Sequence, residues 1–167
     1  MAAVVISTAS LELVLQTPDE VLAWVASLSP ADRAEVSADW IARVQATEAG
    51  DTWTLNFSIV ERAGGSAVGG CGFKGPPDAE GIVEVAYGIE PAHRGRGFAT
   101  EATRALVEFA FASSRVRRVR AHTKPGNSAS TRVLAKCGFR LLGEVMDSED
   151  GLVCRWERGP TEPGTAP

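Results

Sequence analysis

A glycine-rich stretch near the middle of the chain carries the residue types that bind a phosphate group. It reads His93-Arg94-Gly95-Arg96-Gly97-Phe98-Ala99-Thr100-Glu101. The glycines let a ligand approach the backbone closely, and the arginines supply positive charge. A helix that begins just after them would add free backbone N–H groups and the positive end of its dipole. The stretch therefore predicts a site for a small anionic group.

This stretch must be held between a strand and a helix. Residues Ile82–Ile89 are rich in β-branched and aromatic residues, and Pro91 closes the run, which predicts the central strand of a sheet. Apolar residues then recur at spacings of three and four from Phe98 to about Ser113, as in an amphipathic helix. A strand over 116–123 would run parallel to the central strand, because a helical crossover joins them. Ligands bind where such parallel strands diverge.

The remaining elements complete a mixed α/β fold. A short strand at Leu11–Leu15 is followed by Thr17-Pro18-Asp19-Glu20, a capping box that opens a helix. The other expected elements are helices at 18–28 and 30–49, an antiparallel hairpin at 53–61 and 67–73, a short helix at 128–136, and a closing hairpin at 139–145 and 152–156. The fold class is therefore α/β, with antiparallel N-terminal strands, one splayed parallel pair and flanking helices.

Composition places the chain among ordinary globular domains. It has 167 residues, 44% of them hydrophobic, and a net charge of −4. We assign 1–158 to a single domain, and 159–167, with three prolines and two glycines, to a disordered tail. The acidic balance argues against broad binding to nucleic acid or membranes. The chain has no basic leader segment and no long apolar span, so we expect a cytoplasmic location.

Two common phosphate-binding motifs do not fit, and neither does a metal site. No GxxxxGK[ST] sequence occurs, which excludes a Walker loop. Gly95, Gly97 and Thr100 come within one residue of a dinucleotide fingerprint, but arginines stand where its acidic residue should follow. The three cysteines are widely spaced and show no CxxC, so we expect core residues rather than a disulfide framework or a metal site.

The order of motifs resembles the GCN5-related N-acetyltransferase (GNAT) superfamily. The matching pieces are Glu90-Pro91-x-x-Arg94-x-x-Gly97-x-Ala99 after the central strand, Asn127-x-x-Ser130 at the start of the short helix, and Cys137-Gly138-Phe139 before the closing hairpin. The resemblance extends from about Val68 to Trp156. It is greatest to the branch of ribosomal-protein N-terminal acetyltransferases, RimJ and RimL.

The resemblance implies acetyl-CoA as the acyl donor and no metal. The pyrophosphate would lie on the loop, and the pantetheine would pair with the central strand near residues 86–89, where that strand bulges and splays in the family. A freed N–H near Tyr87 would face the thioester carbonyl, a contribution of roughly 3 to 4 kcal/mol in other enzymes. The residues implied are Ile89, Arg94, Gly95, Arg96, Gly97, Phe98, Ala99, Thr100, Asn127 and Ser130. Arg115, Arg117 or Arg118 could reach the ribose phosphate.

The resemblance also implies direct attack of an amine on the thioester, and three residues are candidates for the chemistry. Glu84 could accept the proton of the amine, or it is an exposed strand residue. Ser130 could stabilise the leaving thiolate, or it belongs to the first turn of a helix. Tyr87 could line the acceptor site or pack in the core. His93 and His122 are expected to be structural.

The acceptor is left open by the sequence. At pH 7 an amine with a pKa of about 10.4 is neutral only about 0.04% of the time, a deficit of about 4.6 kcal/mol, whereas an α-amine of pKa about 7.8 loses only about 1 kcal/mol. A protein N-terminus, a small-molecule amine and an aminoglycoside-type antibiotic remain alternatives, as does a non-catalytic acyl-CoA-binding module. Trp24 and Trp40 either pack in the core or wall the acceptor cleft. The chain could be a monomer or a homodimer.

Overall fold

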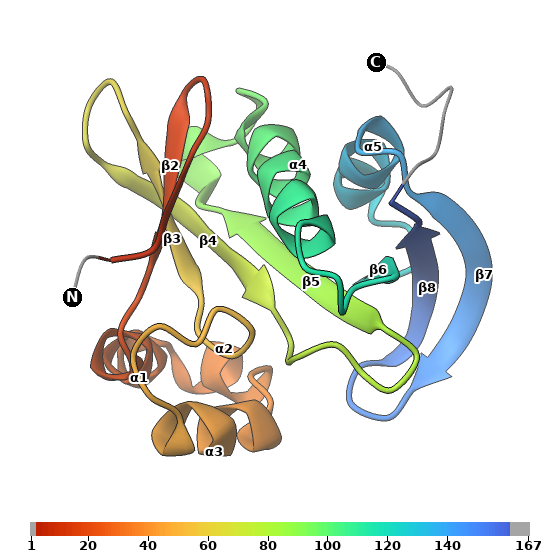
Figure 1. The fold of residues 1–167 in the computed structure, drawn as a ribbon, viewed down its shortest axis with the longest axis horizontal. Helices are drawn as coiled ribbons and strands as arrows, with labels where there is room; N and C mark the ends of the chain where they lie inside the picture. Colours follow the sequence, from red (N-terminus) through yellow and green to blue (C-terminus); the bar gives the residue numbers. More distant parts are fainter. Residues whose placement is uncertain (1–2, 161–167) are drawn as a thin grey trace.

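The computed structural model describes residues 3–160, and eight strands form one continuous order. Along the sheet the order is β1-β2-β3-β4-β5-β6-β8-β7 (Figure 1). The strands are β1 (Val5–Ser7), β2 (Leu11–Leu15), β3 (Phe57–Glu61), β4 (Ala67–Phe73), β5 (Ile82–Ile89), β6 (Arg118–Thr123), β7 (Arg140–Asp147) and β8 (Gly151–Arg158). Only β5 and β6 are parallel, which confirms the predicted mixed fold. Most of the expected tail, residues 161–167, lies outside the described range.

The parallel pair separates after three residues. Register pairs join Ile82 to Arg118 and Glu84 to Arg120, and none follows. Beyond that point β5 stays paired with β4 as far as Ile89, while β6 stays paired with β8. The expected splay is thus present, but the expected bulge in β5 is wrong, because β4 and β5 keep one register over their whole ladder. The two strands separate because each follows its own antiparallel neighbour.

Helices α4 (Phe98–Phe111) and α5 (Ser128–Lys136) lie on the same side of the sheet (Figure 1). One face of α4 is buried against the strands, with Ala102, Leu106 and Ala110 fully enclosed. Val83 and Val85 of β5 belong to the same core. This packing fixes the start of α4, and with it the glycine-rich loop, at the end of β5 where the parallel strands part.

The N-terminal helical region differs in part from the sequence prediction. The capping box of α1 (Pro18–Ser27) is confirmed, with Thr17 and Glu20 bonded to each other's backbone N–H. The helix expected over 30–49 is wrong, because it is two helices, α2 (Pro30–Ala34) and α3 (Ala38–Ala46). Ser37 separates them, since its hydroxyl accepts a hydrogen bond from Trp40 N at 3.2 Å and so starts a new helix.

One strand begins later than predicted, and one further strand was not predicted. The strand expected from Trp53 begins only at Phe57, because the Asp51 carboxylate accepts hydrogen bonds from Trp53 N and Thr54 N and holds a turn there. The apolar alternation that predicted a strand reflects burial of side chains from this turn. Strand β1 was not predicted, since its three residues are too few to show a period. Among the described residues, no helix is long and apolar enough to cross a membrane.

Candidate functional site

The glycine-rich loop has backbone geometry suited to binding an anion. A short 3₁₀ turn, η1 (Pro91–His93), leads from β5 into it, and Gly97 is the N-cap of α4. Gly95 and Gly97 have φ angles of 79° and 81°, a left-handed conformation that favours glycine. Glu101 N is the first amide that bonds back to Gly97 O, so the amides just before it are free for a ligand. They present the positive end of the helix dipole.

A groove of about 530 Å³ runs from this loop along the freed edge of β5 to α5. Inside it, Arg94 Nε donates to Ile89 O at 3.0 Å, which ties the loop to the end of the strand. Nine of the ten residues implied in acetyl-CoA binding line the groove: Ile89, Arg94, Gly95, Gly97, Phe98, Ala99, Thr100, Asn127 and Ser130. The sequence pattern and the geometry therefore agree on one elongated site.

Arg96 is the tenth residue, and it does not line the groove. Its guanidinium forms an ion pair with Glu61 at 2.5 Å and lies over the Phe98 ring at 4.5 Å. Its positive charge is thus paired with a carboxylate of β3 and not directed into the groove. The sequence could not reveal this direction, because the contact joins residues 35 positions apart.

The basic residues near the groove are not those expected for the ribose phosphate. Arg118 pairs with Ile82 at the far end of β5, about 25 Å of strand away from the loop, and Arg117 N bonds to Gly81 there. Instead, Arg132 and Lys136 of α5 line the groove together with His93 of the loop. The two α5 residues are four apart in sequence and so share a helix face, which was the missed signal.

A second cavity, of about 290 Å³, opens where β5 and β6 separate, and it brings all three candidate catalytic residues together. Glu84, Tyr87 and Ser130 line it, with Asn127 beside them. Tyr87, Asn127 and Ser130 also line the groove, so the groove and this reaction cavity adjoin. Asn127 is the N-cap of α5, where its side-chain oxygen accepts a hydrogen bond from Ser130 N at 3.1 Å.

Backbone groups and side chains alternate in direction along β5, and this alternation determines which of them face the gap between β5 and β6. Glu84 O accepts from Lys74 N at 2.9 Å and Glu90 N donates to Val68 O at 2.8 Å, so the backbone groups of even-numbered residues point toward β4. The N–H of Tyr87 therefore points the other way, where β6 no longer pairs with β5. Side chains alternate likewise, so the Glu84 and Tyr87 side chains leave β5 on opposite faces and meet the gap from both sides.

The Tyr87 hydroxyl is available as a hydrogen-bond donor. Its oxygen is buried and has no hydrogen-bond partner within residues 3–160. Burial raises the pKa of Tyr87, and the nearby Ser130 hydroxyl offsets only part of this effect. The phenol is therefore held protonated well into the alkaline range, and a ligand atom in the cavity can receive its hydrogen bond.

Glu84 lies in a network of charged and polar groups. Its Oε2 is 2.9 Å from Lys74 Nζ and 3.2 Å from Nδ1 of His122, a side chain only 5% exposed. The guanidinium of Arg155 donates to His122 Nε2 at 3.1 Å, so that nitrogen carries the lone pair and the proton is on Nδ1, facing Glu84. His122 was expected to be structural, and its contact with Glu84 was missed.

A third cavity, of about 570 Å³, lies on the face of β5 from which the Glu84 side chain leaves. Trp24 and Trp40 both line it, and Trp40 also packs against the core, with its Nε1 donating to Thr54 O at 2.8 Å. Lys74, Ala86 and Asp150 belong to this cavity and to the reaction cavity alike. A ligand entering between the tryptophans would therefore reach the gap from the side opposite the groove.

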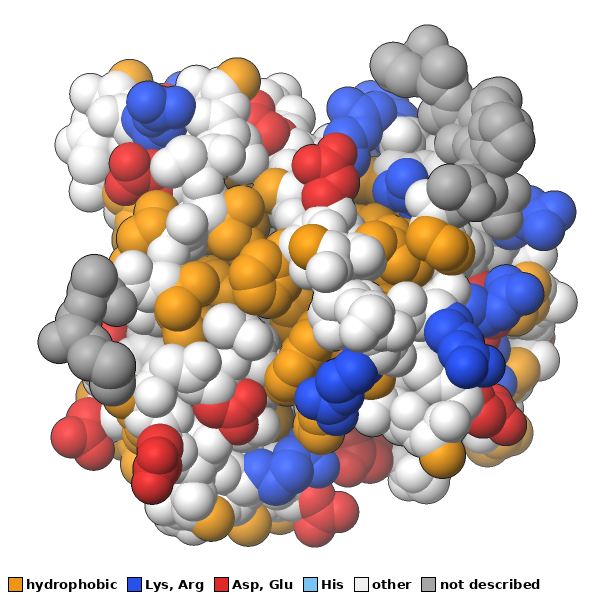
Figure 2. Space-filling model, viewed as in Figure 1, with side chains coloured by type: hydrophobic (Ala, Val, Ile, Leu, Met, Phe, Trp, Pro, Cys, Tyr) orange, Lys and Arg blue, Asp and Glu red, His pale blue; other side chains and the backbone are white. Residues whose placement is uncertain are grey.

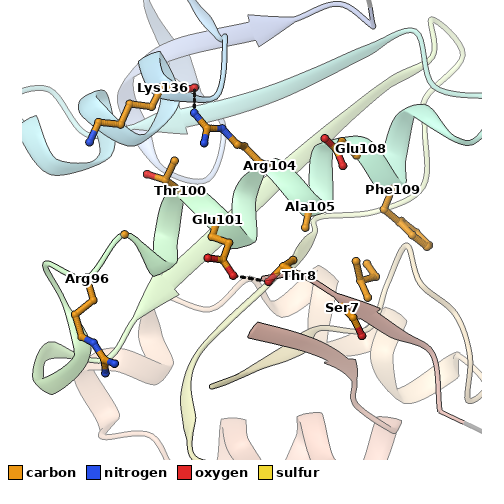
Figure 3. A pocket seen from close by; sticks show the side chains of 12 residues that line it. Ser7, Thr8, Arg96, Thr100, Glu101, Arg104, Ala105, Glu108, Phe109 and Lys136 are labelled. Atoms are coloured by element: carbon orange, nitrogen blue, oxygen red, sulfur yellow. Dashed lines mark hydrogen bonds between the residues drawn. The ribbon is translucent and has the colours of Figure 1, made fainter. Parts of the chain in front are cut away.

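A further cavity, of about 790 Å³, lies between β1 and α4 and shares Gly97, Thr100 and Lys136 with the groove. Figure 2 shows hydrophobic side chains gathered in the hollow between β2 and α4. In Figure 3 the Glu101 carboxylate points to Thr8, and it also accepts a hydrogen bond from Ser10 N at 2.9 Å. None of the residues that line the reaction cavity line this one. These hydrogen bonds join the N-terminal segment to α4.

Comparison with known proteins agrees with this geometry. Residues 7–140 match the model of the acetyltransferase (GNAT) domain family. The chain belongs to the GNAT family. It is similar to the uncharacterized N-acetyltransferase YjdG of Bacillus subtilis, with 34% identity over 95 residues, which are 57% of this chain and 54% of that protein. The chain spans about half the length of the curated relatives it matches.

Solved structures of GNAT acetyltransferases share the fold. The ribosomal-protein-S5-alanine acetyltransferase of Vibrio fischeri superimposes with a TM-score of 0.71 at 16% identity, over 98% of this chain and 100% of that one. RimL, the ribosomal L7/L12 α-N-protein acetyltransferase, in complex with coenzyme A gives a TM-score of 0.69 at 18% identity, over 93% of this chain and 98% of that one. At these identities the likeness concerns the fold alone.

Proposed function

We propose that this GNAT domain transfers an acetyl group from acetyl-CoA to an amine. The observation that carries the proposal is the continuity of three features: an anion cradle, a groove along a freed strand edge, and a gap lined by Glu84, Tyr87 and Ser130. The residues fit a CoA thioester. The positive φ angles of Gly95 and Gly97 expose backbone amides for phosphate, and the buried Tyr87 hydroxyl is left without a partner.

The loop and α5 would hold the donor. Backbone amides at the start of α4 and the Arg94 side chain would bind the pyrophosphate, and Arg132 and Lys136 of α5 lie where a further phosphate would need positive charge. The edge of β5 from Tyr87 to Ile89 has backbone groups free to bond an extended amide chain. Bound acetyl-CoA would supply the thioester carbonyl that the amine attacks and the thiolate that leaves.

Side chains on one face of β5 would accept the proton of the amine, and those on the other face would donate to the leaving sulfur. Glu84, on the acceptor face, accepts a proton from the incoming amine directly or through water. The backbone N–H of Tyr87 points into the gap, where it stabilises developing negative charge on a carbonyl oxygen. On the other face, the Tyr87 phenol, with Ser130 beside it, donates a proton or a hydrogen bond to a leaving sulfur. No metal is required by this scheme.

The acceptor would enter through the cavity walled by Trp24 and Trp40, and two acceptor types remain. A protein N-terminal α-amine needs little help to become neutral, whereas a small-molecule amine of higher pKa depends on a base. Glu84 is placed to serve either type. An aminoglycoside-type antibiotic is a special case of the second, and the acidic side chains Glu35 and Asp39 in the cavity suit cationic acceptors of both types.

Thiol release from acetyl-CoA tests the proposal directly. We expect release with one class among N-terminal peptides, polyamines, amino acids and aminoglycosides, and saturable acetyl-CoA binding by calorimetry. Binding without release from any acceptor would favour an acyl-CoA-binding module instead. Absence of binding would refute the assignment of the groove. The domain limits at 1–158, a cytoplasmic location and a monomeric or homodimeric state remain predictions.

A further inference from the structure

Lys74 has an unusual place at the junction of two cavities. It directly follows β4, and it lines both the reaction cavity and the third cavity, the one lined by Trp24 and Trp40, which we call the acceptor cavity. Its Nζ lies 2.9 Å from Glu84 Oε2 and 3.3 Å from Asp150 Oδ2. One ammonium group thus stands between a strand carboxylate and a carboxylate of the β7–β8 turn, beside the candidate base of the reaction.

Resting on the proposed function, we propose that the Lys74 ammonium holds the place of the acceptor's ammonium in the free protein. The acceptor amine would bind between Glu84 and Asp150 by displacing Lys74, then give one proton to the Glu84 carboxylate and attack as the neutral amine. Lys74 is in this sense a built-in competitor, and the two carboxylates form the acceptor's ammonium site.

The Lys74 side chain is free to leave while its backbone stays fixed. The side chain is 41% exposed, so its ion pairs are partly solvated and cost little to break. The backbone is anchored separately, because Lys74 N donates to Glu84 O at 2.9 Å and the Arg43 guanidinium donates to Lys74 O at 2.5 Å. The side chain can therefore swing into solvent without disturbing β4 or β5.

The charge around this site favours a cation in place of Lys74. Four carboxylates line the acceptor cavity, those of Glu35, Asp39, Glu149 and Asp150, against two cations, Arg43 and Lys74. Among the described residues, Glu35 and Asp39 form no ion pair. Burial alone would lower the pKa of Lys74, yet the carboxylates of Glu84 and Asp150 outweigh it and hold the pKa above its usual value. The site thus stabilises an ammonium ion.

Because its pKa is raised, Lys74 is itself a poor acceptor for the acetyl group. An amine attacks only when neutral, and a raised pKa reduces the neutral fraction of Lys74 further at pH 7. A visiting amine held between the same carboxylates is also protonated, and it becomes a nucleophile only when Glu84 takes its proton. The ion pairs of Lys74 with Glu84 and Asp150 therefore occupy the acceptor's place in the free protein without blocking it permanently.

The test measures binding of propylamine, a simple ammonium probe, to the protein saturated with CoA, so that no turnover occurs. Removing Lys74 as Lys74→Met should tighten propylamine binding about three- to fivefold, as expected for loss of a partly exposed ion pair. Lys74→Arg keeps a cation on both carboxylates and should not tighten binding. Lys124→Met is the matched control, because Lys124 lines the same reaction cavity but its ammonium group forms no ion pair or hydrogen bond among the described residues.

The outcomes separate this inference from the proposed function. If Lys74→Met binds propylamine no tighter than Lys124→Met, or if no variant binds it, the displacement proposal is wrong. Thiol release then gives an independent readout: displacement predicts a lower acceptor KM in Lys74→Met, whereas a positioning role for Lys74 predicts a lower kcat at unchanged KM and overturns the proposal. Propylamine binding without thiol release from any acceptor would refute the acetyltransferase proposal alone.

Discussion

The carboxylate Oε2 of Glu84 lies 3.2 Å from Nδ1 of His122, which is two residues beyond Arg120, the last residue of β6 that pairs with β5. Arg155 fixes the proton of the imidazole on that nitrogen by donating to the opposite one. Glu84 therefore faces a buried N–H on one side and the Lys74 ammonium on the other. Under the proposed function, this carboxylate at the mouth of the gap is the group that accepts the acceptor's proton.

Replacing Glu84 by Gln should separate acceptors by their basicity. With a lysine-like amine we expect kcat to fall about 100-fold, because the base must remove a proton that is rarely lost at neutral pH. With an N-terminal α-amine the loss should be smaller, since that amine is already partly neutral. Steady-state thiol release with one acceptor of each type measures both. Glu80→Gln, in the turn before β5, is the control, and an equal loss for both acceptors would argue against the base role.

Tyr87→Phe should reduce kcat with little effect on the KM for acetyl-CoA. The change removes one buried hydroxyl that has no protein hydrogen-bond partner among the described residues, so packing is retained while the proton donor is lost. We expect a fall of about 100-fold in single-turnover thiol release.

Ser130→Ala and the double variant test whether the two hydroxyls serve the same leaving group. If they do, the double variant should lose less than the product of the single losses. If kcat is unchanged in Tyr87→Phe, the Tyr87 side chain has only a packing role.

Gly97→Ala should lose acetyl-CoA binding as well as stability. At a φ of 81° an alanine costs about 1 to 2 kcal/mol of unfolding free energy, although no atom lies within 4 Å of the added methyl group. Gly50 is the matched control, because its φ is 93°, it has the same open surroundings, and it lies outside the groove.

Both variants should therefore shift urea denaturation alike. Only Gly97→Ala should weaken acetyl-CoA binding by calorimetry, about tenfold, since its methyl group stands where a phosphate approaches the backbone. Equal binding by the two variants would mean that the cradle does not contact the ligand.

The parts of the site that could be predicted from the sequence are those set by local patterns. Three local patterns each lie within a short stretch of sequence: the β-branched run of β5, the apolar spacing of α4 and the Asn127 cap of α5. All three elements formed as expected. The groove follows from them, because a parallel crossover places the loop and the freed strand edge at the same end of the sheet.

The missed contacts join distant parts of the chain. Lys74 and Glu84 meet through the pairing of β4 with β5, and the β7–β8 turn, distant in sequence, brings Asp150 to Lys74. No local sequence pattern indicates the contact with Asp150. Arg96 has the spacing of a phosphate ligand, but Glu61 on a neighbouring strand takes its charge. Ser37 was overlooked for the opposite reason, since an apolar periodicity that ran past it masked a strong cap signal.

Cys71 predicts how stability should depend on alkaline pH. Burial raises the pKa of this thiol from 9.0 to about 12 in the folded protein. Below pH 9 the thiol is protonated in both states, so its contribution is fully present. Between pH 9 and about 12 only the unfolded chain ionises, and the free energy of unfolding should fall by about 1.4 kcal/mol per pH unit from this group.

Cys71→Ala should remove that component, at the expense of about 1 kcal/mol of packing that does not depend on pH. Urea denaturation under reducing conditions at about pH 7 and about pH 10.5 should then show wild type losing about 2 kcal/mol more than the variant. Cys154→Ala, at a partly exposed position on β8, controls for loss of a thiol in general. A constant difference between wild type and Cys71→Ala across this range would show that the folded protein admits the Cys71 thiolate, and hence that water reaches the buried side chains of β4.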